Sequence, residues 1–177
     1  AWGAADLVDR WRLKKMILAV AAGVVIFSLI AIAWFQVGYW KNNLTLFKHA
    51  INVTKDNWLA HNSLGVALSK IGKFDEAIYH FHRTLSIRPK DAIAYNNLGS
   101  TLAMKGELEE AVLNFRKAVA IVPNYVNAID NLGLALFSQK KYEQSQLCFK
   151  KALQLKPNCA SAHYHLGTLL LEHGNVE

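Results

Sequence analysis

The chain has 177 residues, enough for one ordinary domain or for a short membrane anchor followed by a modest domain. Hydrophobic residues make up 53% and charged residues 19%, a composition that excludes a disordered tail and fits a packed core. The net charge of +7 is dispersed: residues 41–177 hold sixteen Lys/Arg interleaved with eleven Asp/Glu. A nucleic-acid site needs basic residues clustered on one stripe, so we expect no nucleic-acid partner.

The first element is a long apolar segment. No charged residue occurs between Met16 and Trp40, and residues 16–35 are almost wholly aliphatic or aromatic. A helix of this length spans roughly 30 Å, the thickness of the hydrocarbon core of a bilayer. Basic residues precede the segment, Trp34 stands at its end and Tyr39 follows it, as interfacial aromatic residues do. The sequence therefore predicts a basic flank over residues 1–15 and a transmembrane helix over residues 16–37.

Two alternatives to an anchor are weaker. A buried helix of a soluble protein rarely runs this far without a charge. A cleavable signal peptide would explain the small residues Ala31 and Ala33, but the preceding segment is long and contains Asp6 and Asp9. Four basic residues precede the span and two follow it closely, which favours a cytoplasmic flank and an extracytoplasmic repeat region, in periplasm or lumen.

The rest of the chain repeats every 34 residues. Leu-Gly dipeptides begin at Leu64, Leu98, Leu132 and Leu166, prolines stand at Pro89, Pro123 and Pro157, and phenylalanines stand at Phe81, Phe115 and Phe149. A fixed period of this length indicates a stack of helical units. We expect first helices over 58–71, 92–105, 126–139 and 160–173, and second helices over 74–87, 108–121 and 142–155.

Turn and cap residues mark the ends of these helices. Gly72, Gly106, Lys140 and Gly174 occupy the turns, and each proline ends a second helix. We expect N-caps at Asp56, Asp91, Asn124 and Asn158. Close packing of the two helices would explain the mid-helix glycines, opposite the small residues Ala77, Ala111 and Ser145.

Residues 58–177 resemble the tetratricopeptide repeat family. In the second unit the family's diagnostic positions read Tyr95, Leu98, Gly99, Leu102, Ala111, Phe115, Ala118 and Pro123. The resemblance implies an all-α solenoid with units at 58–91, 92–125, 126–159 and 160–177, the last with its first helix only. Thr84 and Ser145 replace alanines, and Lys140 replaces the turn glycine. We expect somewhat looser helix packing at these departures.

Both ends of the repeat region extend the pattern. Residues 40–55 read as a lone second helix, with Phe47 and Ala50 in the expected positions, so we expect a linking helix that caps the stack. A solenoid needs a terminal cap, and the fourth unit lacks its second helix. We therefore expect the chain to be part of a longer protein. A structural piece that pairs with another subunit through this fourth unit is a further alternative.

The resemblance implies a concave groove lined by the first helices, in which a polypeptide is held. The candidate groove residues are Asn62, Ser63, Val66, Asn96, Asn97, Ser100, Asp130, Asn131, Leu134, Tyr164 and Thr168. Their asparagines resemble the asparagine ladder of the O-GlcNAc transferase repeats, where side-chain amides grip the partner's backbone. An amide both donates and accepts hydrogen bonds, which suits sequence-tolerant binding of an extended chain. The alternative is that these asparagines only solvate the face or bond locally.

No residue pattern indicates chemistry. His80 and His82 stand two positions apart on one helix, as do His163 and His165, so the members of each pair point to opposite faces and share no metal. His61 falls in a packing position, and the two cysteines match no zinc or redox motif. We expect no catalytic site, cofactor or metal.

A second resemblance concerns the residues around the apolar segment. Asp6, Arg10 to Arg12, and the stretch from Gln36 to Ala50 are similar to the junction in multi-pass glycosyltransferases of the protein O-mannosyltransferase-like kind. The main hypothesis is a membrane-tethered, non-enzymatic scaffold for a protein or peptide partner. The alternative is the substrate-recruiting C-terminal region of such a glycosyltransferase, whose catalytic part would lie upstream.

Overall fold

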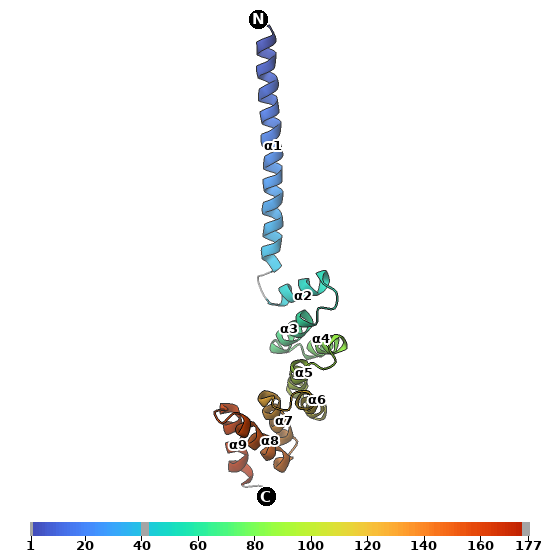
Figure 1. The fold of residues 1–177 in the computed structure, drawn as a ribbon, viewed down its shortest axis with the longest axis vertical. Helices are drawn as coiled ribbons and strands as arrows, with labels where there is room; N and C mark the ends of the chain where they lie inside the picture. Colours follow the sequence, from blue (N-terminus) through green and yellow to red (C-terminus); the bar gives the residue numbers. More distant parts are fainter. Residues whose placement is uncertain (1, 40–42, 175–177) are drawn as a thin grey trace. The chain divides into compact units, whose positions relative to one another are not determined.

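The computed structural model describes residues 2–39 and 43–174, all helical apart from turns, with no strand among them. The chain divides into two compact units, Ala1–Leu46 and Phe47–Glu177. Most of the first unit is a single helix, α1, over Trp2–Tyr39 (Figure 1). The rest of the chain forms α2 (Asn43–Val53), α3 (Trp58–Lys70), α4 (Phe74–Ile87), α5 (Ala92–Lys105), α6 (Leu108–Ile121), α7 (Val126–Ser138), α8 (Tyr142–Leu155) and α9 (Ala160–His173).

Helix α1 contains one stretch that is long and apolar enough to cross a membrane. It runs over Lys14–Trp34, 21 residues with a mean hydropathy of 2.8, and none of it is buried. The hydroxyl of Ser28 donates to the carbonyl of Val24 at 2.8 Å, so its one polar hydrogen is satisfied within the helix. Length and composition are what favour a span here, and a signal sequence near an N-terminus has the same properties.

Helix α2 lies where the sequence predicts a linking helix over 40–55. Phe47, Ala50 and Ile51 are half-buried along one side of it. Residues 40–42 of that prediction lie outside the described residues, as do residues 175–177 of the fourth unit. The capping role of α2 stays a prediction.

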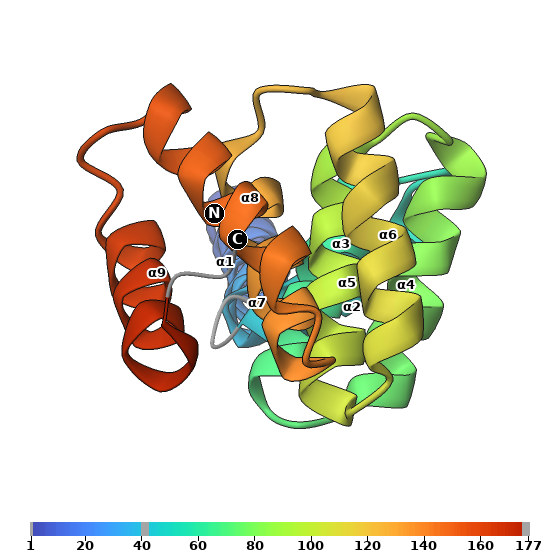
Figure 2. The same cartoon turned by 90° about the horizontal axis from the view of Figure 1, so that it is seen from below.

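The repeat region is built from helix pairs. We call α3, α5, α7 and α9 the first helices and α4, α6 and α8 the second helices. α3, α5 and α7 each pack on the second helix that follows, α9 packs on α8 before it, and Figure 2 shows α3 and α5 beside α4 and α6. Successive first helices also approach one another closely, whereas the backbones of α4, α6 and α8 stay apart within the described residues, where the Arg116 guanidinium donates to Gln144 Oε1 at 3.3 Å across α6 and α8. The first helices are therefore the more closely spaced layer, and the stack curves with them on its inner side.

The core repeats with the sequence. The rings of Phe81, Phe115 and Phe149 are almost wholly buried, each beneath the glycine of a Leu-Gly dipeptide. A Cβ added at Gly65 or Gly99 would lie 2.8 Å from the Cε1 atom of the facing ring. Gly65, Gly99 and Gly133 are thus required by the phenylalanine rings more than by the small residues that the sequence suggested, whereas no atom lies within 4 Å of a Cβ added at Gly167.

The turns between the paired helices share a residue with a positive φ angle. Gly72 and Gly106 have φ of 78° and 94°, and Lys140 adopts φ of 61° in the same place. Gly174, after α9, has φ of 68° but ψ of −169°, a different conformation from that of Gly106. After Gly106, the N–H of Glu107 donates to the carbonyl of Leu102 at 2.9 Å, the bond that closes a Schellman motif. The structure confirms that residue 140 takes the glycine's conformation without being a glycine.

The expected N-caps are correct at one position of four. The side chain of Asp91 accepts from the N–H of Ala94 at 3.0 Å, as predicted. In the first unit Asn57, rather than Asp56, accepts from Ala60 N at 2.9 Å. The cap residues of α7 and α9 are Tyr125 and Cys159, neither of which makes a side-chain cap bond, so Asn124 and Asn158 were wrong. These asparagines stand one residue before the cap positions, inside the turns.

The looser packing expected at the departures from the repeat pattern is not seen in the buried core. Thr84 and Ser145 are fully buried. The Thr84 hydroxyl lies 3.1 Å from the carbonyl of His80, and the Ser145 hydroxyl donates to the carbonyl of Gly133 at 2.7 Å. Each added hydroxyl is hydrogen-bonded to backbone, which offsets the cost of burying it.

Candidate functional site

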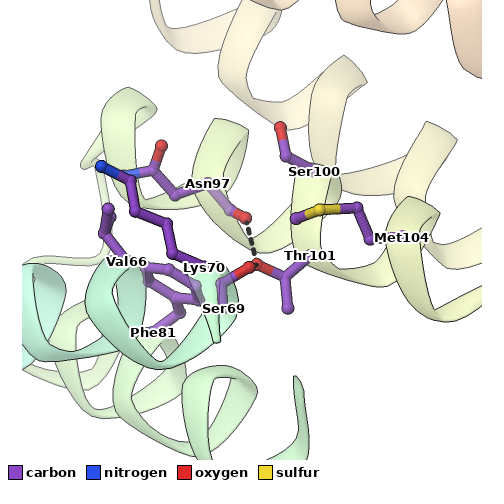
Figure 3. A pocket seen from close by; sticks show the side chains of 8 residues that line it. All are labelled: Val66, Ser69, Lys70, Phe81, Asn97, Ser100, Thr101 and Met104. Carbon is purple, nitrogen blue, oxygen red and sulfur yellow. Dashed lines mark hydrogen bonds between the residues drawn. The ribbon is translucent and has the colours of Figure 1, made fainter. Parts of the chain in front are cut away.

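The inner side of the repeat region carries three hollows, each between two successive first helices; together they form what we call the inner groove. The first lies between α3 and α5, measures about 200 Å³ and is lined by Val66, Ser69, Lys70, Phe81, Asn97, Ser100, Thr101 and Met104 (Figure 3). The second, between α5 and α7, measures about 370 Å³. The third, between α7 and α9, measures about 140 Å³.

The three hollows are equivalent positions of the repeat. Adding 34 to each residue that lines the first hollow gives a residue that lines the second: Ser100, Ala103, Met104, Phe115, Asn131, Leu134, Ala135 and Ser138. Leu108 is the one addition. The third hollow continues the series with Leu134, Phe137, Phe149, His165 and Thr168, joined by Tyr164. The groove is thus one subsite repeated with different side chains.

Polar side chains bridge successive first helices and form the rungs of a ladder. Asn97 Nδ2 donates to Asn62 Oδ1 at 3.2 Å, and Asn131 Nδ2 donates to Asn96 Oδ1 at 3.0 Å. In the third rung, His165 Nδ1 lies 3.1 Å from Asp130 Oδ1. The two residues of each rung are 35 positions apart, one more than the repeat length of 34. Each side chain therefore bonds to the residue next to its equivalent in the preceding repeat.

The structure brings most of the predicted groove residues together. Val66, Asn97, Ser100, Asn131, Leu134, Tyr164 and Thr168 line the three hollows. Asn62 lines a separate hollow of about 340 Å³ at the ends of α3 and α5. Asn96 and Asp130 are buried, at 8% and 4% exposure, and act as acceptors of the ladder. Ser63 is half-buried on α3 and lines none of these hollows.

The candidate residues left out several lining positions, among them one row at the ends of the first helices. Lys70, Met104 and Ser138 occupy the same repeat position, near the C-terminal ends of α3, α5 and α7, and line the first two hollows. Their side chains differ too much to be recognised as a row. The signal that could have found them is the helical spacing, because Met104 stands four residues after Ser100.

The hollow at the ends of α3 and α5 is basic and apolar. It is lined by Trp58, Leu59, Arg88, Lys90, Ile93 and Val122, among others. The Arg88 guanidinium stacks 4.2 Å from the Trp58 ring and lies 3.9 Å from a carboxylate oxygen of Asp91. Its positive charges contrast with the second and third hollows, where no Lys or Arg is among the lining residues.

A histidine pair links α3 to α4. His61 Nδ1 lies 2.9 Å from His80 Nδ1, so one nitrogen donates and the other accepts while both rings are neutral. Burial lowers the pKa of both imidazoles; Arg83 lowers that of His61 further, and the positive forms of His61 and Lys48 lower that of His80 against the pull of Glu76. The spacing of histidines along a single helix could not reveal this pair, because its two members lie on different helices.

Other potentially reactive groups give no indication of chemistry. Cys148 is half-buried, and burial raises the pKa of its thiol, which disfavours the nucleophilic thiolate. Across residues 2–39 and 43–174, no three His, Cys, Asp or Glu side chains converge to hold a metal ion.

Models of protein families match most of the repeat region. A model described as tetratricopeptide repeat covers residues 56–124, and one described as TPR repeat covers residues 133–174. No curated protein matches the chain.

Solved structures of the same fold are numerous. The first TPR of Spaghetti (RPAP3), bound to the HSP90 peptide SRMEEVD, is 25% identical with a TM-score of 0.65 and covers 71% of this chain and 99% of its own. MamA is 24% identical with a TM-score of 0.68, and the match covers 74% of this chain and 77% of the MamA chain. The Sgt2 TPR domain from Aspergillus fumigatus is 24% identical with a TM-score of 0.63, and the match covers 65% of this chain and 78% of the Sgt2 chain. The repeat region of this chain is an α-solenoid that belongs to the tetratricopeptide repeat family.

Proposed function

We propose that the protein is a non-enzymatic, membrane-tethered scaffold that holds an extended polypeptide in the inner groove. The observation that carries the proposal is the repeated subsite, three hollows in 34-residue register bridged by polar rungs. A regular row of equivalent subsites suits a ligand that is itself regular, and an extended backbone has that property.

The rungs leave hydrogen-bonding capacity for a ligand. A side-chain amide offers two N–H donors and two acceptor positions, and the first rung uses one donor of Asn97 and one acceptor position of Asn62. Both side chains are half-buried, so the remaining positions can reach a bound backbone. The fold relative that carries the HSP90 peptide supports the peptide-binding class of function, because the chain covers nearly all of that domain.

The rung itself provides the test. In Asn62→Ala combined with Asn97→Ala, both partners of one bond are removed, which leaves no unsatisfied buried amide. We expect the helical content and melting temperature to change little and partner capture to fall. The matched control is Asn124→Ala with Asn158→Ala, two exposed asparagines in turns.

Capture can be read by photo-crosslinking in the full chain. A photoreactive amino acid replaces Leu134, which is 40% exposed in the groove, or Leu113, which is 53% exposed on α6. We expect polypeptide adducts from position 134 that weaken in the Asn62/Asn97 double variant. Equal adducts from both positions, or adducts that the double variant leaves unchanged, contradict the groove assignment.

We propose that α1 supplies the membrane tether, with the repeat region extracytoplasmic. The support is the 21-residue apolar stretch and the excess of basic residues before it. Resistance of the chain to alkaline carbonate extraction would support an uncleaved anchor, and recovery of a shortened, soluble chain would contradict it. A reporter fused after Glu177 tests the orientation, since a cytoplasmic signal would reverse it.

The alternative role, as the substrate-recruiting part of a membrane glycosyltransferase, is favoured only by the sequence resemblance around residues 6–50. It uses the same groove and assigns no catalysis to these residues. The gene sequence upstream of Ala1 tests it: many transmembrane spans with an acidic catalytic loop support it, and a short leader removes it.

A further inference from the structure

The three subsites of the inner groove differ in chemistry although they share one register. At three equivalent positions the first hollow has Ser69, Lys70 and Thr101, and the second has Ala103, Met104 and Ala135. Ser69 and Thr101 are buried and hydrogen-bonded to each other, and Met104 lines both hollows, so the difference that a ligand meets is the charged Lys70 side chain of the first hollow. The second hollow is the uncharged one of these two.

The few polar groups around the second hollow are occupied by one another. Asn131 Nδ2 donates to Asn96 Oδ1 at 3.0 Å and lies 3.5 Å from Ser100 Oγ. The Ser100 hydroxyl donates to the backbone carbonyl of Asn96 at 2.9 Å, and the Ser138 hydroxyl donates to that of Leu134 at 3.1 Å. A ligand side chain that enters this hollow therefore meets an apolar floor and a rim whose hydroxyl donors are already used.

Two large apolar side chains of this hollow remain open to solvent. Met104 is 57% exposed and Leu134 is 40% exposed, beside the buried ring of Phe115. Covering such a surface is favourable, because apolar surface leaves water. Methionine also adapts its shape to different ligand groups. At about 370 Å³ the hollow is the largest of the three in the inner groove.

Charge excludes the opposite class of ligand. None of the nine residues that line the second hollow is charged. A carboxylate placed there would lose hydration without gaining a cationic partner, which is costly. The basic groups of this part of the groove, Lys70 and Arg88, lie in other hollows.

We infer that the second hollow, between α5 and α7, is the specificity subsite of the groove and binds one large, uncharged apolar side chain of the extended polypeptide. This inference rests on the proposed function and adds which residue class the partner carries. The partner is thus an extended segment with a leucine, methionine or phenylalanine flanked by uncharged residues, rather than an acidic tail.

The methionines of the chain provide a direct reporter. The sequence has two, Met16 in α1 and Met104 in the second hollow. The full chain, labelled with ¹³C at the methionine methyl groups and held in detergent, is titrated with capped Gly/Ser peptides whose central residue is Leu, Glu or Ser. We expect the Met104 signal to shift in a saturable way with the Leu peptide, at an affinity about tenfold higher than for the other two. The Met16 signal serves as the internal control.

A matched pair of variants separates the subsites. Ser138→Lys places a charged side chain in the second hollow without changing the first, at an exposed position that leaves the core intact. We expect it to weaken the Leu peptide about tenfold, measured by fluorescence anisotropy, while Lys70→Met leaves that affinity unchanged.

The outcomes distinguish the two levels of the proposal. Equal binding of all three peptides, or a Leu peptide that binds without moving the Met104 signal, overturns the subsite and leaves the groove in place. Absence of binding by every peptide, together with loss of the crosslinks from position 134, overturns both.

Discussion

The ring of Phe149 lies directly against Gly133, so closely that a Cβ added at Gly133 would stand 2.6 Å from the Cε1 atom of the ring. The same glycine gives its carbonyl to the hydroxyl of Ser145 at 2.7 Å. Two contacts from α8 thus converge on one residue of α7. By contrast, a Cβ added at Gly167, at the equivalent place on α9, would have no atom of another described helix within 4 Å.

Gly133→Ala should therefore destabilise the repeat region by about 1–3 kcal/mol, the usual cost of overpacking a filled core. Gly167→Ala is the matched control, and we expect it to be neutral or to stabilise by up to about 1 kcal/mol, because alanine favours helix. Urea titrations followed by circular dichroism measure both. Equal effects of the two variants would mean that the ring moves aside freely.

Lys140→Gly should stabilise the third unit. Lys140 has φ of 61°, a conformation that costs a side-chain-bearing residue about 1–2 kcal/mol and costs glycine little. Part of this gain is offset by the greater freedom of glycine in the unfolded chain, so we expect about 1 kcal/mol. The reciprocal variant, Gly106→Lys at φ of 94°, should destabilise. A melting temperature for Lys140→Gly at or below that of the parent would contradict this reading.

Asn57→Ala should cost about 1 kcal/mol, because the side chain caps α3 through the N–H of Ala60. Asn158→Ala should have little effect on the same measurement, since Cys159 is the cap residue of α9. Thermal unfolding of the two variants compares them directly. A larger loss of stability in Asn158→Ala than in Asn57→Ala would show that Asn158 caps α9, as the sequence suggested.

The His61–His80 pair should make stability depend on pH. Both imidazoles have a pKa below the ordinary value of 6.5 in the folded chain, so the unfolded chain binds protons first as pH falls. The contribution of the pair is therefore complete above pH 6.5 and decreases as pH falls below it toward the lowered pKa values.

The test uses residues that the chain itself places in the next unit. His61→Tyr with His80→Asn copies Tyr95 and Asn114, one repeat later. We expect a flatter dependence of the unfolding free energy on pH between neutral and mildly acidic conditions. His82→Ala, at an exposed position of α4, should leave the dependence of the unfolding free energy on pH the same as in the parent protein. An unchanged slope in the double variant would exclude the pair as its source.

The sequence was informative where one physical signal dominates. The period of the Leu-Gly, proline and phenylalanine positions predicts each first and second helix to within a residue, as at α3, which ends at Lys70 rather than residue 71. The N-caps were less predictable, since they depend on the backbone angles of a single turn residue such as Asn57.

Contacts between helices were the least predictable part of the site. Asn62 and Asn97 were both placed in the groove, but their bond to each other follows from the way α3 crosses α5, which shifts the pairing by one residue. These asparagines therefore bond to each other between helices, and their role in binding a ligand stays a prediction. The pairing of His61 with His80 depends in the same way on how α3 lies on α4.

The contacts between successive first helices have a mechanical consequence. Because the backbones of α3, α5 and α7 approach one another in sequence while those of α4, α6 and α8 stay apart within the described residues, with one exposed side-chain bond between Arg116 and Gln144, each helix pair can tilt about the line of contact between the first helices. Bending is then easiest where it changes the distance between successive second helices. A polypeptide that bridges several hollows would contact more than one helix pair. Its binding would therefore make the repeat region stiffer and fix its curvature.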